Sequence, residues 1–168
     1  YDPLKFFGAT KGKKMTIGIV GIGGLGTMGI KMAHAMGHRV VAISTSTAKE
    51  AMAKEKGADA FVVSTDPASV EKEANSCDII LNTVSVPHQV ENYLGLVAQS
   101  GVIVQLGLFG EPHQVNQVPM VLNRKGIYGS LIGGVKNTEE CLEFCSKHNV
   151  LPDTQTVTAK QIDWVYHQ

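Results

Sequence analysis

The sequence has no excess of either charge and no long apolar run. Its 168 residues include 15 lysines and arginines and 15 aspartates and glutamates, so the formal net charge is zero. That balance argues against nucleic acid or an anionic membrane surface as the main partner. No apolar run approaches the roughly 20 residues that span a membrane. The first residues lack the basic start and apolar middle of a signal peptide. We therefore expect neither a membrane span nor a signal peptide in this sequence.

Cysteine is also scarce, with three residues: Cys77, Cys141 and Cys145. An odd number without a framework spacing is typical of a reducing compartment, and we therefore expect a cytoplasmic protein. Cys141 and Cys145 lie one turn apart on a predicted helix, but no second pair of ligands accompanies them. We interpret them as buried structural thiols and predict no metal site in this chain.

Glycine, in contrast, is concentrated after the first apolar run, at residues 15–20. Gly21 allows a tight turn out of the strand, Gly23 lets a pyrophosphate approach the backbone, and Gly26 lets the next helix pack closely. The N–H groups at the start of that helix attract phosphate. The alternative is a glycine-rich turn that binds nothing. The G-x-G-x-x-G spacing predicts a dinucleotide site at Gly21, Ile22, Gly23, Gly24, Leu25 and Gly26.

Strand and helix patterns alternate along the rest of the chain. Because the strands are almost continuously apolar, they predict a doubly wound α/β fold, or Rossmann fold. It would have a parallel six-stranded sheet in the order 3-2-1-4-5-6, with helices on both faces. The predicted strands are residues 15–20, 39–44, 61–63, 78–82, 102–106 and 126–132, and the predicted helices are 25–36, 47–56, 68–74, 88–98 and 138–149.

Two further segments carry weaker signals. Thr47 and Glu50 have the spacing of a capping box, which predicts the start of a helix. Residues 114–122, from Gln114 to Leu122, are mixed in character. Pro119 in this segment cannot donate to a strand ladder, so the segment suits the edge of the sheet.

The end of the second strand indicates which dinucleotide binds. NAD-binding folds usually have an acidic residue there, about 20 residues beyond the glycines, that binds the ribose hydroxyls. This sequence has Ser44, Thr45 and Ser46 instead, followed by Lys49. Hydroxyl groups and a lysine bind a 2′-phosphate that a carboxylate would repel. These residues predict NADP(H), and the alternative is a polar loop without a ligand.

The ends of the later strands face the same crevice in a doubly wound sheet. They carry small and hydroxyl residues, which let the nicotinamide half of a cofactor lie against the backbone. Each could also be an ordinary transition from strand to loop. The residues predicted on this side are Thr83, Val84, Gly107, Ser130, Leu131 and Ile132.

Taken together these motifs resemble the medium-chain zinc alcohol dehydrogenases, most closely the cinnamyl-alcohol dehydrogenase branch. Asn82 departs from the family, which often has aspartate there, and we expect this to affect binding little. The matching stretches cover nearly the whole chain: YDPLK at 1–5, GIGGLG at 21–26, STS at 44–46 with Lys49, GAD at 57–59, NTVS at 82–85, GSLIGG at 129–134, and residues 136–149.

The resemblance implies reversible NADP-dependent oxidation of a primary alcohol to an aldehyde, with a zinc ion that polarises the oxygen. The cysteine and histidine ligands of that zinc have no counterpart in this sequence. The resemblance therefore implies that residues 15–158 form an NADP-binding domain. Residues 1–14 and 159–168 would connect it to a catalytic domain that this sequence lacks, and the chain alone would be inactive.

The resemblance also implies a homodimer in which two cofactor domains pair along the side of residues 114–122. Two other interpretations stay open. One is a free-standing module that senses NADP(H) and regulates a partner. The other is a zinc-free quinone oxidoreductase of the same superfamily.

Overall fold

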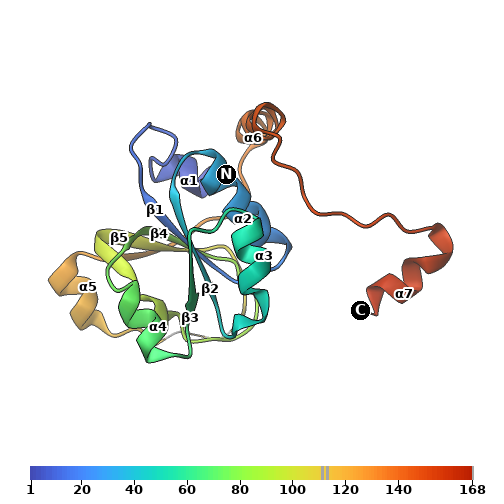
Figure 1. Ribbon diagram of the computed structural model, residues 1–168. Helices are drawn as coiled ribbons and strands as arrows, with labels where there is room; N and C mark the ends of the chain where they lie inside the picture. Colours follow the sequence, from blue (N-terminus) through green and yellow to red (C-terminus); the bar gives the residue numbers. More distant parts are fainter. Residues whose placement is uncertain (111, 113, 168) are drawn as a thin grey trace.

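A single sheet fixes the arrangement of the other elements. The computed structural model describes residues 1–110, 112 and 114–167. Within these residues all strand pairs of a six-stranded sheet are parallel, in the order β3-β2-β1-β4-β5-β6. The predicted fold and strand order are confirmed (Figure 1). The strands are β1 (Thr16–Val20), β2 (Arg39–Ser44), β3 (Ala60–Val63), β4 (Cys77–Asn82), β5 (Val97–Gln105) and β6 (Gly126–Gly129).

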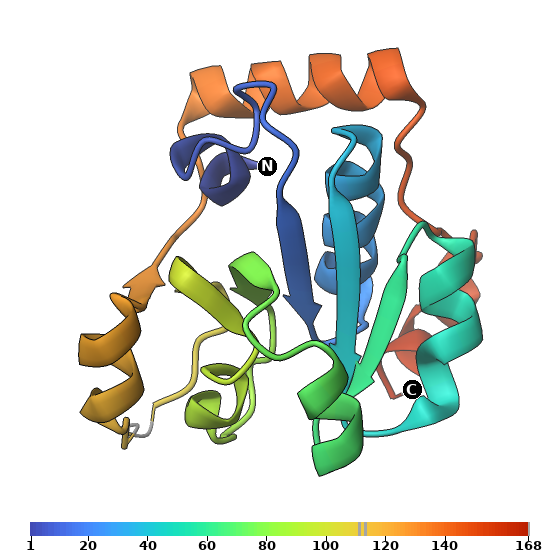
Figure 2. The same ribbon diagram turned by 60° about the vertical axis from the view of Figure 1, so that its left-hand side comes forward.

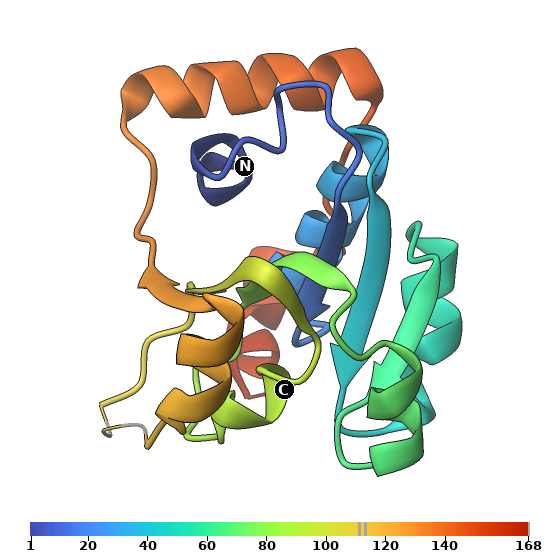
Figure 3. The same cartoon turned by 90° about the vertical axis from the view of Figure 1, so that its left-hand side faces the viewer.

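Helices cover both faces of the sheet (Figures 2 and 3). The short helix α7 stands apart from the sheet at the end of an extended segment (Figure 1). Among the residues that the structure describes, none of the helices has the length and apolar character needed to cross a bilayer. The α-helices are α1 (Asp2–Phe6), α2 (Gly24–Ala35), α3 (Glu50–Glu55), α4 (Pro67–Lys72), α5 (Gln117–Asn123), α6 (Val135–His148) and α7 (Ile162–Tyr166), and the 3₁₀ helices are η1 (Thr47–Lys49), η2 (Val90–Tyr93) and η3 (Ala159–Gln161).

The core has two layers because successive side chains of a strand point to opposite faces. Along β2, Val40 and Ala42 are buried on the face that α2, α3 and α6 cover. Val41 and Ile43 are buried on the other face, against η2 and parts of α4 and α5. Burial on both faces explains why the strands read as continuous apolar runs rather than alternating ones.

Asp59 fixes the start of β2 against the third strand. Its backbone N–H donates to the Val40 carbonyl oxygen at 2.8 Å, and its carboxylate accepts from the Val40 N–H at 2.8 Å. Gly57, just before it, has a φ of 110°, and a Cβ there would lie 2.6 Å from the His34 ring. The GAD motif therefore sets the register of β2 and β3.

The helix predicted over residues 88–98 is wrong. Only the 3₁₀ helix Val90–Tyr93 forms there, and β5 already begins at Val97, which pairs with Cys77. Val90, Tyr93 and Leu94 are buried with the spacing of a helix, which explains the prediction. Gly95 weakens a helix by about 1 kcal/mol relative to alanine, and the pairing with Cys77 commits the following residues to the sheet.

Residues 114–122 do not form the edge of the sheet, because β6 occupies that position. Most of the segment belongs to α5, whose N-cap Asn116 accepts a hydrogen bond from the Val118 N–H at 3.0 Å. Pro119 is the third residue of α5, in the first turn, where its missing N–H costs nothing. Asparagine is a favoured N-cap residue, so Asn116 is the signal in the sequence that indicates a helix here, and the prediction of a sheet edge overlooked it.

Three smaller predictions also differ from the structure. The capping box at Thr47 is absent, since Ser46 is the N-cap of η1 and no side-chain cap bond forms there. The last strand ends at Gly129 rather than at residue 132. The segment 1–14 contains a helix, α1, with Pro3 in its first turn.

Candidate functional site

The glycine turn joins β1 to α2 and is closely packed at two of its three glycines. Gly21 has a φ of 87°, which glycine adopts more easily than other residues. A Cβ on Gly26 would lie 1.7 Å from the Gly21 carbonyl oxygen, so the helix rests directly on the turn. Both glycines therefore have the structural roles that their spacing predicts.

Gly23, in contrast, faces open space: no atom lies within 4 Å of the position that a Cβ would take, and the same is true of Gly24. The 12-residue helix α2 begins at Gly24, and its N-cap, Gly23, has no side chain to accept hydrogen bonds. The first N–H groups of a helix have no partner within the helix, and they carry a partial positive charge. The turn thus offers an open cradle that fits an anionic phosphate group.

Thr83 ties the end of β4 to this turn. Its hydroxyl lies 2.8 Å from the Val20 carbonyl oxygen and 3.1 Å from that of Gly21, and donates to them. Gly107, after β5, packs against Val84, the residue that follows Thr83 beyond the end of β4, because a Cβ on Gly107 would lie 2.0 Å from the Val84 carbonyl oxygen. The predicted residues at the ends of β1, β4 and β5 are therefore brought together, at the point where the strand order reverses.

Lys49 links the end of β2 to the glycine turn, because its ammonium group donates to the Ile22 carbonyl oxygen at 2.8 Å. Ser44 is half-buried at the end of β2, while Thr45 and Ser46 are exposed. The lysine therefore joins the residues predicted to bind the 2′-phosphate to those predicted to bind the pyrophosphate. Its nitrogen has three N–H donors, so it can bind a phosphate oxygen while it keeps this contact.

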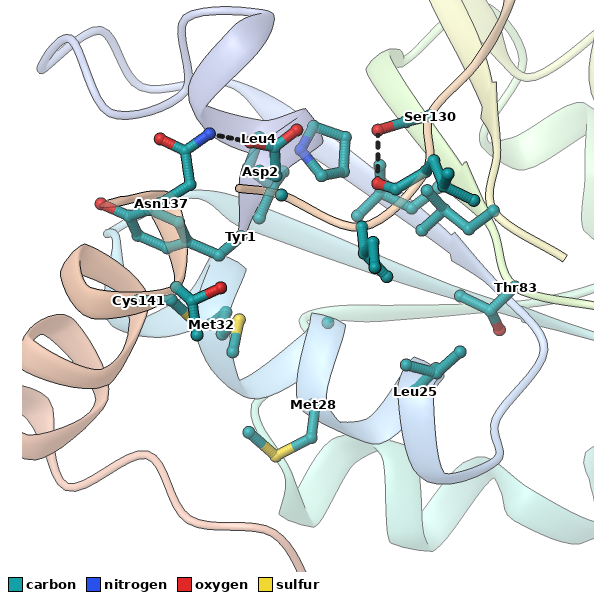
Figure 4. A pocket seen from close by; sticks show the side chains of 18 of the residues that line it. Tyr1, Asp2, Leu4, Leu25, Met28, Met32, Thr83, Ser130, Asn137 and Cys141 are labelled. Atoms are coloured by element: carbon teal, nitrogen blue, oxygen red, sulfur yellow. Dashed lines mark hydrogen bonds between the residues drawn. The ribbon is translucent and has the colours of Figure 1, made fainter. Parts of the chain in front are cut away.

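The far end of the crevice opens into a cavity of about 590 Å³ (Figure 4). Ser130, Leu131 and Ile132 line one side of it, after the end of β6, and Thr83 and Leu25 line its floor. The side chains of Leu131 and Ile132 are 74% and 89% exposed. Such an apolar cavity beside a phosphate cradle suits a flat ring system.

Several residues of this cavity were not predicted from the sequence. Met28 and Met32 of α2 line the cavity together with Cys141 of α6 (Figure 4), and both methionines also pack in the core or against it. No local pattern in the sequence indicates that α1 and α6 stand opposite this face of α2. Among the predicted residues, Ile22 has a buried side chain, so only its backbone is available to a ligand.

The cysteines do not form a reactive centre. Cys77 is buried, and its burial raises the pKa of the thiol to about 11, which keeps it protonated at neutral pH. Cys141 and Cys145 are half-buried rather than fully buried as predicted. Among the residues that the structure describes, no three histidine, cysteine, aspartate or glutamate side chains gather in a way that suits a metal ion.

Known proteins with similar sequences cover the whole chain. It is 42% identical over 169 residues to aldehyde reductase YahK of Escherichia coli K12, a match to 100% of this chain and 48% of that protein. The chain thus spans about half the length of the curated relatives it matches.

Two solved structures superpose on nearly all of the chain. A cinnamyl alcohol dehydrogenase from Sorghum bicolor has a TM-score of 0.90 and 31% identity, over 99% of this chain and 47% of that one. CAD from Helicobacter pylori, solved as a complex with NADP(H), has a TM-score of 0.82 and 33% identity, over 99% of this chain and 47% of that one.

A family comparison agrees with these relatives. Residues 24–147, more than half of the chain, match the family described as zinc-binding dehydrogenase. The resemblance seen in the sequence motifs is thereby confirmed, and the parallel sheet with its glycine turn is the fold of the solved relatives. This chain belongs to the zinc-binding dehydrogenase family, and it spans about half the length of the relatives that it matches.

Proposed function

We propose that this chain is the NADP(H)-binding part of a zinc-dependent alcohol dehydrogenase that interconverts primary, cinnamyl-type alcohols and aldehydes. The observation that carries the proposal is the open cradle at Gly23, at the N-terminus of α2 and at the reversal of strand order. Ligands of open α/β sheets bind in this crevice. The proposal also draws on the relatives, whose names describe alcohol and aldehyde chemistry and an NADP(H) complex.

The cofactor would lie across the ends of the strands. The turn from Gly21 to Gly26 would hold the pyrophosphate, and Ser44, Thr45, Ser46 and Lys49 would hold the 2′-phosphate. The nicotinamide would lie towards Thr83, Val84, Gly107 and residues 130–132, where the cavity is apolar. When bound, the cofactor supplies or accepts a hydride, and the residues of this chain hold and orient it.

The zinc ion of this proposal would be held outside the described residues, which have no suitable cluster of ligands. We propose residues 15–158 as the cofactor domain and residues 1–14 and 159–168 as connections to a catalytic domain. Zinc analysis of the natural protein separates the dehydrogenase from a zinc-free quinone oxidoreductase. Its mass separates both from a free-standing NADP(H)-sensing module, because an enzyme of this family is about twice as long as this chain.

The chain is expected to bind NADPH at least tenfold more tightly than NADH, because Lys49 and the hydroxyls near Ser44 would contact the 2′-phosphate, which NADH lacks. Titration by fluorescence or calorimetry measures both dissociation constants. Ser44→Asp should weaken NADPH binding about tenfold or more through charge repulsion and leave NADH little changed. Ser146→Asp on the exposed face of α6 is the control. Equal affinities for the two cofactors in the native chain would remove the argument for NADP(H).

We also propose a homodimer through the side of the sheet that residues 114–122 cover. Most of this segment belongs to α5, on which Val118, Val121 and Leu122 are 60%, 75% and 74% exposed. Exposed apolar side chains next to the edge strand β6 form a surface suited to a two-fold contact with the same segment of a second copy.

Sedimentation or light scattering at tens of micromolar is expected to detect this dimer. Val118→Asp should dissociate it by placing a charge in an apolar interface. Leu151→Asp, an exposed substitution close to Asp153 and α3, should leave the dimer intact. A native chain that stays monomeric would contradict the proposal.

A further inference from the structure

Asn82, the last residue of β4, is fully buried and makes three side-chain hydrogen bonds. Its Oδ1 accepts from the Val84 N–H at 3.3 Å. Its Nδ2 donates to the Gln105 Oε1 at 2.6 Å and lies 2.7 Å from the His88 Nε2. Because a backbone N–H can only donate, the Val84 contact assigns the amide oxygen of Asn82, and the amide nitrogen must then face the other two partners.

This assignment also determines the tautomer of His88. Both hydrogens of the Asn82 amide are donated, so the His88 Nε2 accepts one of them and carries no proton. The other ring nitrogen, Nδ1, lies 2.7 Å from the Val86 carbonyl oxygen, which can only accept. His88 is therefore neutral, with its proton on Nδ1. Its ring packs beside those of Phe109 and Tyr93, with centroid distances of 5.1 and 5.9 Å.

The residue that Asn82 holds, Val84, lies between two glycines of the cofactor crevice. A Cβ on Gly21 would meet the Val84 Cγ2 at 2.8 Å, and a Cβ on Gly107 would meet the Val84 carbonyl oxygen at 2.0 Å. A shift of Val84 would therefore move one or both of the turns that it contacts. The hydrogen bond from its N–H to Asn82 restrains that shift from inside the sheet.

We propose that Asn82 is a positioning residue for the cofactor: it fixes Val84 between the glycine turns and holds His88 as the neutral Nδ1–H tautomer. It would do so without contact with the ligand, since its side chain is fully buried. The effect on binding rests on the proposed NADP(H) function, whereas the tautomer of His88 does not depend on it.

Nitrogen-15 NMR of the histidine side chains tests the hydrogen-bond assignment in the native chain without cofactor. The expected signature at pH 7 is a protonated Nδ1 and an unprotonated Nε2 for His88. Asn82→Asp should change this signature to a doubly protonated ring, because both carboxylate oxygens accept and the Nε2 must then donate. A protonated Nε2 on His88 in the native chain would overturn the assignment.

Affinity for NADPH tests the positioning. Asn82→Leu keeps a similar volume but removes all three hydrogen bonds, and it should weaken binding about tenfold. Asn82→Asp should recover most of this loss, because aspartate again accepts from the Val84 N–H. Asn92→Leu, an exposed substitution on η2, is the control and should bind as the native chain does.

The outcomes separate this proposal from the proposed function. If Asn82→Leu fails to fold, His88→Leu removes the contacts of the ring with Asn82 and with the Val86 carbonyl oxygen at a half-buried position, and it should still weaken binding several-fold. A folded Asn82→Leu variant with native affinity would overturn the positioning role. A native chain that shows the expected tautomer but no affinity for NADPH would overturn the proposed function and the positioning role, but leave the hydrogen-bond assignment intact.

Discussion

Gly23→Val is expected to abolish NADPH binding while the chain stays folded. The backbone of Gly23 is extended, with φ −112° and ψ −161°, a conformation open to valine. No atom lies within 4 Å of the position of the new Cβ, so the branch point of the valine side chain has room. The valine would instead fill the cradle at the start of α2. We expect a loss of about 100-fold or more, equivalent to about 2.7 kcal/mol.

The measurement is a titration with NADPH, together with a thermal unfolding curve to show that the variant is folded. Gly95→Val is the matched control, because Gly95 is also exposed and has no atom within 4 Å of its Cβ position, but lies between η2 and β5. It should bind NADPH normally. Native affinity in the Gly23→Val variant would show that the phosphates bind elsewhere.

Gly26→Ala is expected to have the largest effect on stability among these substitutions. The new Cβ would lie 1.7 Å from the Gly21 carbonyl oxygen and 2.9 Å from its carbon, and both are backbone atoms. No rotation of a side chain can relieve this contact, so α2 must move away from the end of β1. We expect the free energy of unfolding to fall by about 3 kcal/mol or more.

Urea denaturation measures the free energy of unfolding of Gly26→Ala and of the control Gly24→Ala, two substitutions within one turn of the same helix. Gly24 has open space at its Cβ position, and alanine favours a helix by up to about 1 kcal/mol over glycine. Gly24→Ala should therefore be neutral or slightly stabilising. Equal stabilities of the two alanine variants would contradict the close packing of α2 on the turn.

The Asn82 network shows why part of the site was hidden in the sequence. Asn82, His88 and Gln105 come from β4, the loop after it and the end of β5, and their spacing along the chain has no period. Their meeting depends on the pairing of β4 with β5, which places Asn82 opposite Gln105. The contact between Lys49 and Ile22 arises in the same way, from the neighbouring positions of β1 and β2.

The sequence by itself determined the parallel sheet, its order and the glycine turn. These follow from local patterns: apolar runs of strand length, and glycines at positions where a side chain has no room. The packing at Gly21 and Gly26 is a direct consequence of that spacing.

Only the tertiary structure decided between helix and strand near residue 97. It also made most of residues 114–122 part of the helix α5, whereas β6 forms the edge of the sheet. It also placed α1 and α6 opposite α2, which creates the cavity. In each case the deciding contacts join residues far apart in the chain. The local pattern fits more than one structure there, and the pairing energy of the sheet and the packing of its faces select between them.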